Sequence, residues 1–374
     1  MDPDFSMHAR AWLHLSATPG VGPAAIRALL GAFGPPKSIF AQDEDRLTAV
    51  VGAARARALM TADPAREAAV HRALEWLHGQ GERTLLTLDN PAYPARLLDL
   101  ADPPCLLYVL GDPARLTSPA MAIVGSRQAS AVGLEHARHF AQHLSQAGLT
   151  ILSGLAQGID GAAHEGALGQ RSSTVAFIGT GIDRVYPARH HALARSIVER
   201  GGAIASELAL GTPPHQSNFP RRNRLIAAAA QGVLVVEAAA KSGSLITARL
   251  AADLGREVFA IPGSIHSALA RGCHALLREG AKLVETAHDV LAEFPQLAVP
   301  AAAPAAAPAA APERLVPASQ HDPALEQLGW EPAGIETLIL GSGESAACWN
   351  VRLLGWELHG LAARLEDGRW QRLR

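Results

Sequence analysis

The chain has 374 residues, 48% of them hydrophobic, and a formal net charge of −2. This length allows two or three domains of about 100–200 residues each, and the composition is that of a globular protein with a core. A nearly neutral chain has no global field that attracts nucleic acid. Any binding of DNA or RNA therefore requires a local basic patch.

The cysteines and the terminal sequence bear on the cellular compartment. Cys105, Cys273 and Cys348 are scattered and form no CxxC pair, which argues against a disulfide framework or a zinc cluster. No charged-then-apolar signal segment opens the chain, and no run of 18 apolar residues occurs. We therefore expect a cytoplasmic protein with no membrane contact.

Residues 1–65 are predicted to form a small helical domain, because Ala, Leu and Arg dominate and Gly and Pro punctuate. The turn Pro19-Gly20-Val21-Gly22 lies between apolar helices and resembles a helix-hairpin-helix or SAM-like unit. Its backbone N–H groups can meet a phosphate. The alternative is a tight turn between two packed helices, and the sequence leaves open whether this domain touches DNA.

Residues 66–118 form a transition. A helix is expected at about 66–79, followed by two short strand candidates, 84–89 and 105–112. Pro91, Tyr93, Pro94, Pro103 and Pro104 lie between them. Prolines at this density predict an extended segment that wraps over a neighbouring domain.

Residues 119–294 alternate strand and helix patterns. Continuous apolar runs predict strands at 121–125, 149–154, 174–179, 202–207, 233–237, 257–263 and 282–284. Helices are predicted between them at 132–147, 158–168, 190–200, 221–230, 244–254 and 270–279. Apolar strands joined by helices indicate a mostly parallel sheet covered on both faces. The predicted fold class is α/β, an extended, doubly wound Rossmann-like domain over 66–294.

The C-terminal part is predicted to be a linker and a small domain. Residues 295–317 are almost all Pro and Ala, which predicts an extended, semi-rigid linker. Residues 318–374 are typical of a winged helix, with a two-strand wing that turns at Asp367-Gly368. Because its helix-turn-helix region is poor in basic residues, we do not expect DNA binding from it by default.

Four strand ends are rich in Gly and Ser. The first strand ends in Val124-Gly125-Ser126-Arg127, and others lead into 153–160, 179–183 and Lys241-Ser242-Gly243-Ser244. In a parallel sheet these ends share one edge, where ligands bind. Gly125 allows close backbone approach, Ser126 offers a hydroxyl, and Arg127 can grip a phosphate. Lys241, Gly243 and Ser244 are further candidates on this rim.

A basic cluster lies further along the chain, and its members are Phe219, Arg221, Arg222, Asn223 and Arg224. Arginines at a helix start are unfavourable with the helix dipole, and no acidic partner is evident in the sequence. We interpret the cluster as a site for an external anion. The aromatic neighbour favours a nucleic-acid backbone with a base stacked on the ring.

Other chemistry is weakly supported. The dinucleotide-binding motif GxGxxG, followed by an acidic residue about 20 positions on, does not occur, and neither does the P-loop motif GxxxxGK[ST]. The sequence therefore indicates no cofactor, and it indicates no metal site. Asp160 and His164 share a helix face, and we read them as structural, with Asp160 capping the helix and His164 packing beside the rim. Glu207 and Glu237 each end a strand. Either would be a catalytic carboxylate or a cap for loop N–H groups.

Six motifs in order resemble the DNA-processing protein A family, also called Smf: VGSR at 124–127, SGLAQGIDGAAHEGAL at 153–168, GTGIDRVYP at 179–187, FPRRNRLIA at 219–227, VVEAAAKSGSLITA at 235–248 and GREVFAIPG at 255–263. The resemblance implies a non-enzymatic protein that binds single-stranded DNA in natural transformation and loads the RecA recombinase onto it. It also implies a homodimer through the Rossmann-like domain.

The resemblance carries DNA contacts over to Gly125, Ser126, Arg127 and the group from Phe219 to Arg224. Gln216 stands where some members have a lysine, and His190 stands where many have an asparagine. The alternative is a phosphoribohydrolase-like enzyme that processes nucleotides on the same rim. Such hydrolases carry a PGGxGTxxE motif, which nothing at 257–270 resembles.

Overall fold

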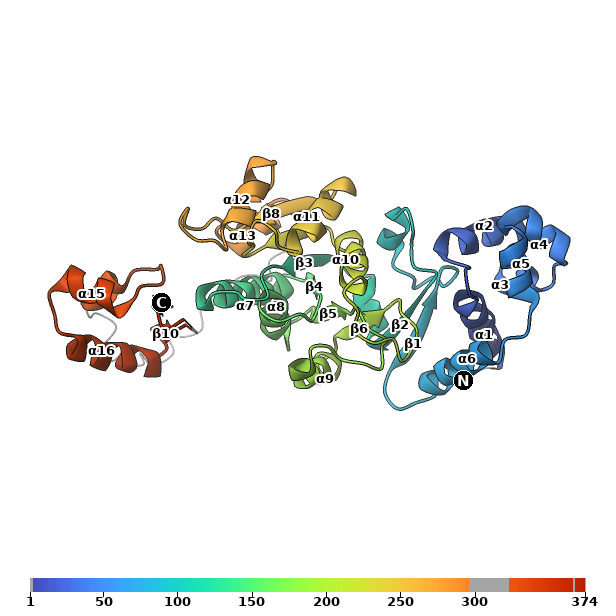
Figure 1. Ribbon diagram of the computed structural model, residues 1–374, viewed down its shortest axis with the longest axis horizontal. Coiled ribbons are helices and arrows are strands. Elements are labelled where there is room, and N and C mark those ends of the chain that lie inside the picture. Colours follow the sequence, from blue (N-terminus) through green and yellow to red (C-terminus); the bar gives the residue numbers. More distant parts are fainter. Residues whose placement is uncertain (1–2, 296–322, 366, 374) are drawn as a thin grey trace.

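The computed structural model describes residues 3–295, 323–365 and 367–373 (Figure 1). Apart from residue 295, the predicted linker lies outside the described residues. So do residues 318–322 of the last predicted domain.

The N-terminal part is helical, as predicted. Its helices are α1 (Pro3–Ala17), α2 (Pro23–Phe33), α3 (Pro36–Phe40), α4 (Glu44–Val51), α5 (Ala53–Met60) and α6 (Pro64–Leu77). Trp12, Leu29 and Leu47 lie in a core of their own there. Gly20 has a φ of 75°, and its carbonyl accepts a 2.9 Å hydrogen bond from Nε of Arg55. The predicted turn is therefore packed against α5.

A nine-stranded sheet forms the centre of the molecule (Figure 1). Its strands are β1 (Arg83–Thr87), β2 (Leu106–Gly111), β3 (Ala120–Val124), β4 (Thr150–Ser153), β5 (Thr174–Phe177), β6 (Ala203–Ser206), β7 (Gly232–Val235), β8 (Glu257–Ala260) and β9 (Lys282–Leu283). They lie in the order β1-β2-β6-β5-β4-β3-β7-β8-β9. Strands β3 to β9 are parallel, and β2 runs antiparallel to both of its neighbours, β1 and β6, so β2 alone among the nine strands is reversed. This confirms the predicted mostly parallel sheet.

Helices cover both faces of the sheet. They are α7 (Ala131–Gln146), α8 (Ile159–Ala167), α9 (His191–Glu199), α10 (Asn218–Ala229), α11 (Ser244–Asp253), α12 (Arg271–Arg278) and α13 (Ala287–Ala292). Along β3, Met121 and Ile123 pack in one core with α7, α8 and α13, and Ala122 and Val124 pack in another with α10, α11 and α12. Alternate side chains of a strand point to opposite faces, which is why every position of β3 is apolar.

The proline-rich segment between β1 and β2 connects two parts of the molecule. Leu88 and Cys105 pack in the N-terminal core, and the hydroxyl of Tyr93 donates a 2.7 Å hydrogen bond to the carbonyl of Pro104. The 3-10 helix η1 (Ala95–Asp99) within it packs against α10. The predicted wrap thus lies between the N-terminal helices and the sheet, and its two flanking strands join the sheet edge.

The C-terminal residues form a small winged helix with its own core. Its elements are α14 (Pro323–Leu328), α15 (Ile335–Ser342), α16 (Ala346–Leu358), β10 (Ala362–Arg364) and β11 (Trp370–Arg372). Trp349, Leu353 and Trp356 of α16 are buried in it. The wing turns at Gly368, whose φ is 84°. Within the described part of the chain, no helix has both the length and the apolar character to span a bilayer.

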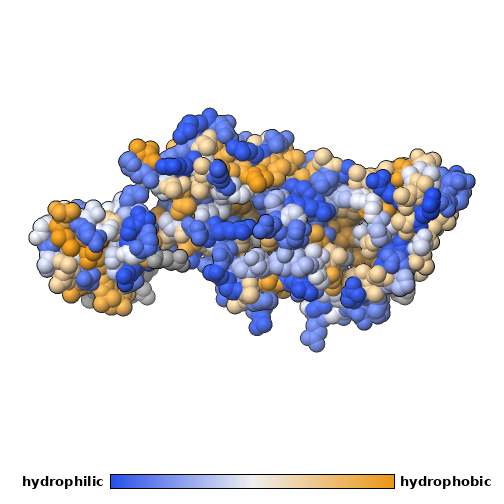
Figure 2. Space-filling view, in the orientation of Figure 1, coloured by the Kyte–Doolittle hydropathy of each residue, from blue (hydrophilic) through white to orange (hydrophobic). Residues whose placement is uncertain are grey.

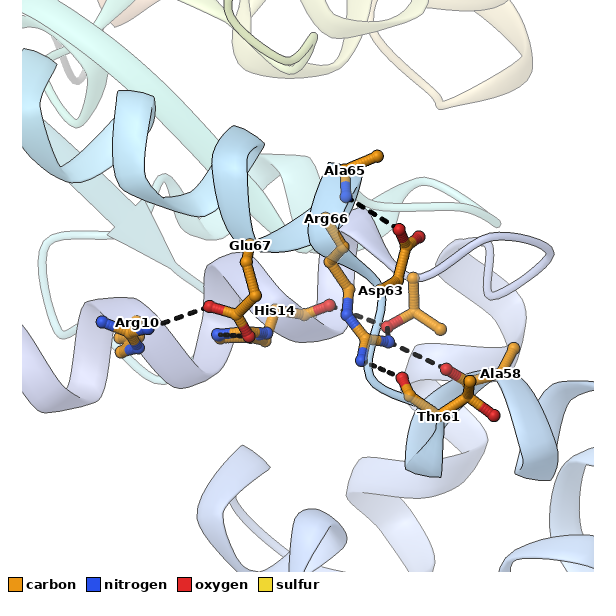
Figure 3. A network of polar contacts seen from close by, with 9 residues as sticks. Arg10, His14, Ala58, Thr61, Asp63, Ala65, Arg66 and Glu67 are labelled. Carbon is orange, nitrogen blue, oxygen red and sulfur yellow. Dashed lines mark hydrogen bonds and ion pairs between the residues drawn. The ribbon is translucent and has the colours of Figure 1, made fainter.

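Polar contacts fasten α6 to the N-terminal helices (Figure 3). The Arg66 side chain is buried, and its guanidinium donates to the hydroxyl of Thr18 at 3.2 Å and to the carbonyls of Ala58 and Thr61 at 2.8 and 2.6 Å. Glu67, one residue on, accepts a 2.9 Å hydrogen bond from Arg10 of α1. The interior contacts of Arg66 are worth more than the exposed pair, because water cannot replace them.

We predict that Arg66→Ala lowers the free energy of unfolding by about 3 kcal/mol, because the buried guanidinium loses its three hydrogen bonds to Thr18, Ala58 and Thr61. Thermal unfolding of the full chain measures the change. Arg57→Ala is the matched control, since the Arg57 side chain is 71% exposed and its pair with Glu44 is worth less than about 1 kcal/mol. Equal effects of the two substitutions would contradict this account.

Candidate nucleic-acid interface

The predicted rim is confirmed by the topology. Strands β3, β4, β5 and β7 are parallel neighbours in one sheet, so their carboxyl ends lie along the same edge. The chain leaves β3 toward β4, β5 and β6 on one side and then crosses to β7 on the other. Ligands of open α/β sheets bind at such a switch point, and the loop after β3 lies there.

Gly125 and Ser126 shape the loop after β3. The Ser126 N–H donates a 2.7 Å hydrogen bond to the carbonyl of Glu237, and the Ser126 carbonyl accepts one of 3.1 Å from the N–H of Ile159. A Cβ at position 125 would lie 2.6 Å from the Ile159 side chain, so only glycine fits there. The Ser126 hydroxyl accepts from the N–H of Gln128 and is nearly buried. The next residue, Arg127, is exposed.

Arg127 lies over one aromatic ring, and a second aromatic ring lies beside the first. Its guanidinium carbon lies 5.5 Å from the ring centroid of Phe219, which is within cation–π range. The ring of Tyr186 lies 5.6 Å from that of Phe219, tilted by 38°, and Tyr186 is 47% exposed. We call Arg127, Tyr186 and Phe219 the arginine–aromatic cluster. A single strand of DNA can pair its phosphates with the positive charge of this cluster and stack its bases on the two rings.

The position of Phe219 depends on Gly179 and on the start of α10. A Cβ on Gly179, after β5, would lie 2.9 Å from the Phe219 ring. Helix α10 begins at Asn218, three residues before the predicted start at 221. Phe219 therefore lies in the first turn of the helix and packs on the end of β5.

Tyr186 was missed as a site residue in the sequence. It belongs to GTGIDRVYP at 179–187, which follows the third strand of the predicted rim. The position of an aromatic residue after a rim strand was the feature of the sequence that could have indicated Tyr186 as a site residue. Only the fold shows that the loop brings it back beside Phe219.

Arg222 lies inside the protein. It is 5% exposed, and its guanidinium donates to the carbonyls of Gly154 and Phe177 at the ends of β4 and β5. Burial lowers the pKa of Arg222 to about 10, and the nearby carboxylate of Asp160 opposes that shift. A Cβ on Gly154 would collide with this guanidinium. Arg222 therefore holds α10 to the sheet.

The interpretation that the basic cluster lacks an acidic partner is wrong. Glu207, which follows β6, accepts a hydrogen bond from the buried Arg224 and lies 3.2 Å from Nε of Arg221. Asp102 of the proline-rich segment pairs with Arg224 at 3.4 Å. Burial raises the pKa of Glu207, and the two arginines act against that shift. Only Arg221 of this pair is half-exposed, at 49% of its side chain.

The remaining predicted site residues are Asn223, Lys241, Gly243 and Ser244, and they differ in exposure. Asn223 is half-buried, and Lys241 and Gly243 are exposed. The hydroxyl of Ser244 is 2.7 Å from that of Ser242, and Ser244 is buried at the start of α11. The contacts of this turn are local, whereas Arg127 and Phe219 meet directly.

Asp160 and His164 are structural, as predicted. The Asp160 carboxylate accepts from the N–H groups of Gly154 and Ala156 in the loop before α8, so it fastens that loop rather than capping the helix. His164 is fully buried beneath the rim loop 153–160, and its ring nitrogens meet the N–H of Leu155 in that loop at 3.3 Å and the hydroxyl of Thr174 at 2.7 Å. Burial lowers the pKa of His164 to about 3.

Glu237, the other candidate carboxylate, is also engaged. Its two oxygens accept from the N–H and the hydroxyl of Ser130 at 2.9 and 2.5 Å. Ser130 is the N-cap of α7, so Glu237 fixes the start of that helix. Both strand-end carboxylates therefore hold protein groups in place.

Comparisons with known proteins agree with this geometry. A family model described as DNA recombination-mediator protein A matches residues 84–295, and one described as a SAM-like helix-hairpin-helix tandem matches residues 13–62. The Escherichia coli protein Smf is 46% identical over 222 residues, and the match spans only 59% of either chain. A putative DNA processing protein DprA of Mycobacterium tuberculosis is 37% identical over 98% of this chain and 95% of its own.

Solved structures show the same fold. The DNA processing protein A of Streptococcus pneumoniae superposes with a TM-score of 0.64 at 34% identity, covering 78% of this chain and 98% of that one. The Helicobacter pylori protein, described with a unique single-stranded DNA binding mode, gives a TM-score of 0.52 at 30% identity over 57% of this chain and 96% of its own.

The fold and the rim define a Rossmann-like protein whose candidate ligand site lies at the carboxyl edge of a mostly parallel sheet. The chain belongs to the DNA-processing protein A (DprA/Smf) family.

The buried His164 predicts a pH dependence of stability. Its folded pKa of about 3 lies below the ordinary value of 6.5, so the unfolded chain binds the extra proton. This contribution to stability is complete above about pH 6.5 and is lost as the pH falls toward 3, at about 1.4 kcal/mol per pH unit. Melting curves between pH 4 and 7 should show a flatter dependence for His164→Asn than for the unsubstituted chain. His139→Asn, on the exposed surface of α7, should keep the original dependence, and an unchanged slope in His164→Asn would refute the assignment.

Proposed function

We propose that this protein binds single-stranded DNA, protects it, and loads the RecA recombinase onto it during natural transformation and recombination. The observation that carries the proposal is the arginine–aromatic cluster on the carboxyl edge of the sheet. The family description as a recombination mediator supports it, as does the single-stranded DNA binding described for the Helicobacter pylori relative.

Arg127 is the principal phosphate contact in this proposal. It is exposed, and its aromatic neighbour holds the guanidinium over the rim. Arg221, half-exposed beside Glu207, provides a second contact. Phe219 and Tyr186 provide flat faces for bases, which stack on any aromatic ring irrespective of sequence. Binding then weakens with salt in proportion to the phosphates neutralised.

The buried arginines have a positioning role in this proposal. Arg222 and Arg224 are 5% and 7% exposed and are engaged by carbonyls and carboxylates of the protein. They fix the first turn of α10, and hence Phe219. Gly125 and Ser126 give the loop its shape and present Arg127. Lys241, with Gly243 and Ser244, adds positive charge and backbone at the far end of the rim.

The partners and the compartment belong to the same proposal. The partners in this proposal are single-stranded DNA and RecA, and the protein meets both of them in the cytoplasm. A homodimer through the Rossmann-like domain is supported by exposed apolar side chains toward the β9 edge: Ile265 is 76% exposed and Leu283 is 54% exposed. A contact between two copies at this edge would remove both side chains from water.

The proposed role is not enzymatic. The two strand-end carboxylates that a nucleotide hydrolase would use are held by Ser130 and by Arg221 and Arg224. Incubation of the protein with nucleoside monophosphates, followed by chromatography, tests this point. Steady turnover that disappears in Glu237→Gln would replace the proposal with a nucleotide-processing enzyme.

Arg127→Ala should weaken binding of a single-stranded oligonucleotide by roughly 10- to 150-fold, because a charge-assisted contact worth about 1.5–3 kcal/mol is lost. Fluorescence anisotropy with the full chain measures the affinity. Gel shifts with single- and double-stranded oligonucleotides, on the full chain and on residues 1–294, then locate the binding in the core.

The control is Arg249→Ala, which removes an exposed arginine from α11 that pairs with Glu279. It should change the affinity less than about twofold, because it lies outside the cluster. If Arg127→Ala and Arg249→Ala behave alike while both remain folded by circular dichroism, the proposed site is wrong.

A further inference from the structure

Helix α16 leaves a stripe of apolar side chains exposed on the winged helix. Val351 is 74% exposed, Leu354 56% and Leu358 79%, and Ala347 precedes them on the same face. Figure 2 shows apolar side chains gathered over this end of the molecule. The opposite face of α16 is already covered, because Trp349 and Trp356 lie in the core of the domain.

The spacing of the stripe is that of a helix-pairing seam. Positions 347, 351, 354 and 358 are separated by four, three and four residues, which is the a/d pattern of a heptad repeat. Such a seam packs against a second helix that carries the same repeat. A second copy of α16 carries the same apolar repeat and can therefore be this partner helix.

The charges of α16 do not suit a nucleic-acid groove. Arg352 and Glu357 are its only charged residues, and Arg352 pairs with Glu344 and lies over the ring of Trp349. A face that reads DNA needs cations directed at phosphates. The helix in the recognition position therefore presents a surface for protein.

We infer that α16 pairs in antiparallel orientation with α16 of a second copy of this chain. Placing Val351 opposite Leu354 of the second copy also sets Ala347 opposite Leu358, so the seam is self-complementary. Asn350 and Glu357 flank the seam on one side, seven residues apart, and both are exposed. Antiparallel pairing brings Glu357 of each copy opposite Asn350 of the other.

The orientation follows from these two polar residues. In the antiparallel pair the Asn350 amide donates to the Glu357 carboxylate, and this contact occurs twice by symmetry. A parallel pair would leave both side chains facing no polar partner on α16. Polar residues that flank a seam commonly select the orientation in this way.

The contact is small. Helix α16 has 13 residues and is therefore about 20 Å long. One such seam buries less than the roughly 800 Å² per partner of a standard interface. The α16 seam therefore acts between copies that another contact already holds close. This pairing is separate from the proposed binding of DNA.

A disulfide trap in the full chain tests the pairing. Asn350→Cys and Glu357→Cys are combined in a Cys348→Ser background, in which Cys105 and Cys273 remain buried. Within one helix, positions 350 and 357 lie about 10 Å apart, beyond the roughly 7 Å that a disulfide spans between Cα atoms. Mild oxidation should therefore give a covalent dimer of the double-cysteine chain on a non-reducing gel.

The single-cysteine chains are the matched controls, because antiparallel pairing keeps position 350 away from position 350 of the second copy. They should cross-link at least tenfold more slowly. Adding Leu354→Glu to the double-cysteine chain should reduce its cross-linking to the rate of the single-cysteine chains. Equal rates in the double- and single-cysteine chains overturn the inference, as does cross-linking that survives Leu354→Glu. Oligonucleotide affinity, measured on the same samples, reports separately on the DNA site.

Discussion

The start of helix α10 is fastened to the sheet by two buried arginines, and the candidate site depends on that attachment. Arg222 donates to the carbonyl ends of β4 and β5, and Arg224 pairs with Glu207 after β6. Arginines buried in this way are stable only with their partners in place, because an unpaired charge in the interior is costly. The first turn of this helix carries Phe219, whose ring lies beside Arg127 from the loop after β3 and beside Tyr186 from the loop after β5. Buried ionic contacts thus determine where the exposed groups lie.

The sequence pattern was enough to predict the parallel sheet, but it did not predict which arginines are buried and which are exposed. Continuous apolar runs such as the one ending at Val124 predict parallel strands because both faces of such a sheet are covered. Four consecutive positions that include three arginines give no sign of which side chain turns inward. Glu207 lies 17 residues before Arg224, and only the crossover from β6 to α10 brings them together. Tyr186 could not be predicted for the same reason, because the course of the loop after β5 brings it beside Phe219.

The two ends of the chain carry different surfaces. The rim of the sheet presents Arg127 and aromatic rings, whereas α16 of the winged helix presents Val351, Leu354 and Leu358. A charged and aromatic surface suits a polyanion with bases, and an apolar heptad seam suits another helix. In our proposals the rim of the Rossmann-like domain contacts DNA, and α16 adds a contact between copies on a different domain.

The central claim is that exposed arginines contact DNA while buried ones position the site. Arginine modification by phenylglyoxal, followed by mass spectrometry, tests it on the unaltered protein with and without a single-stranded oligonucleotide. We expect Arg127 and Arg221 to be modified in the free protein and protected by the oligonucleotide, and Arg222 and Arg224 to remain unmodified in both samples. Modification of Arg222 and Arg224 in the free protein with protection by DNA, or no protection of Arg127, would contradict the account.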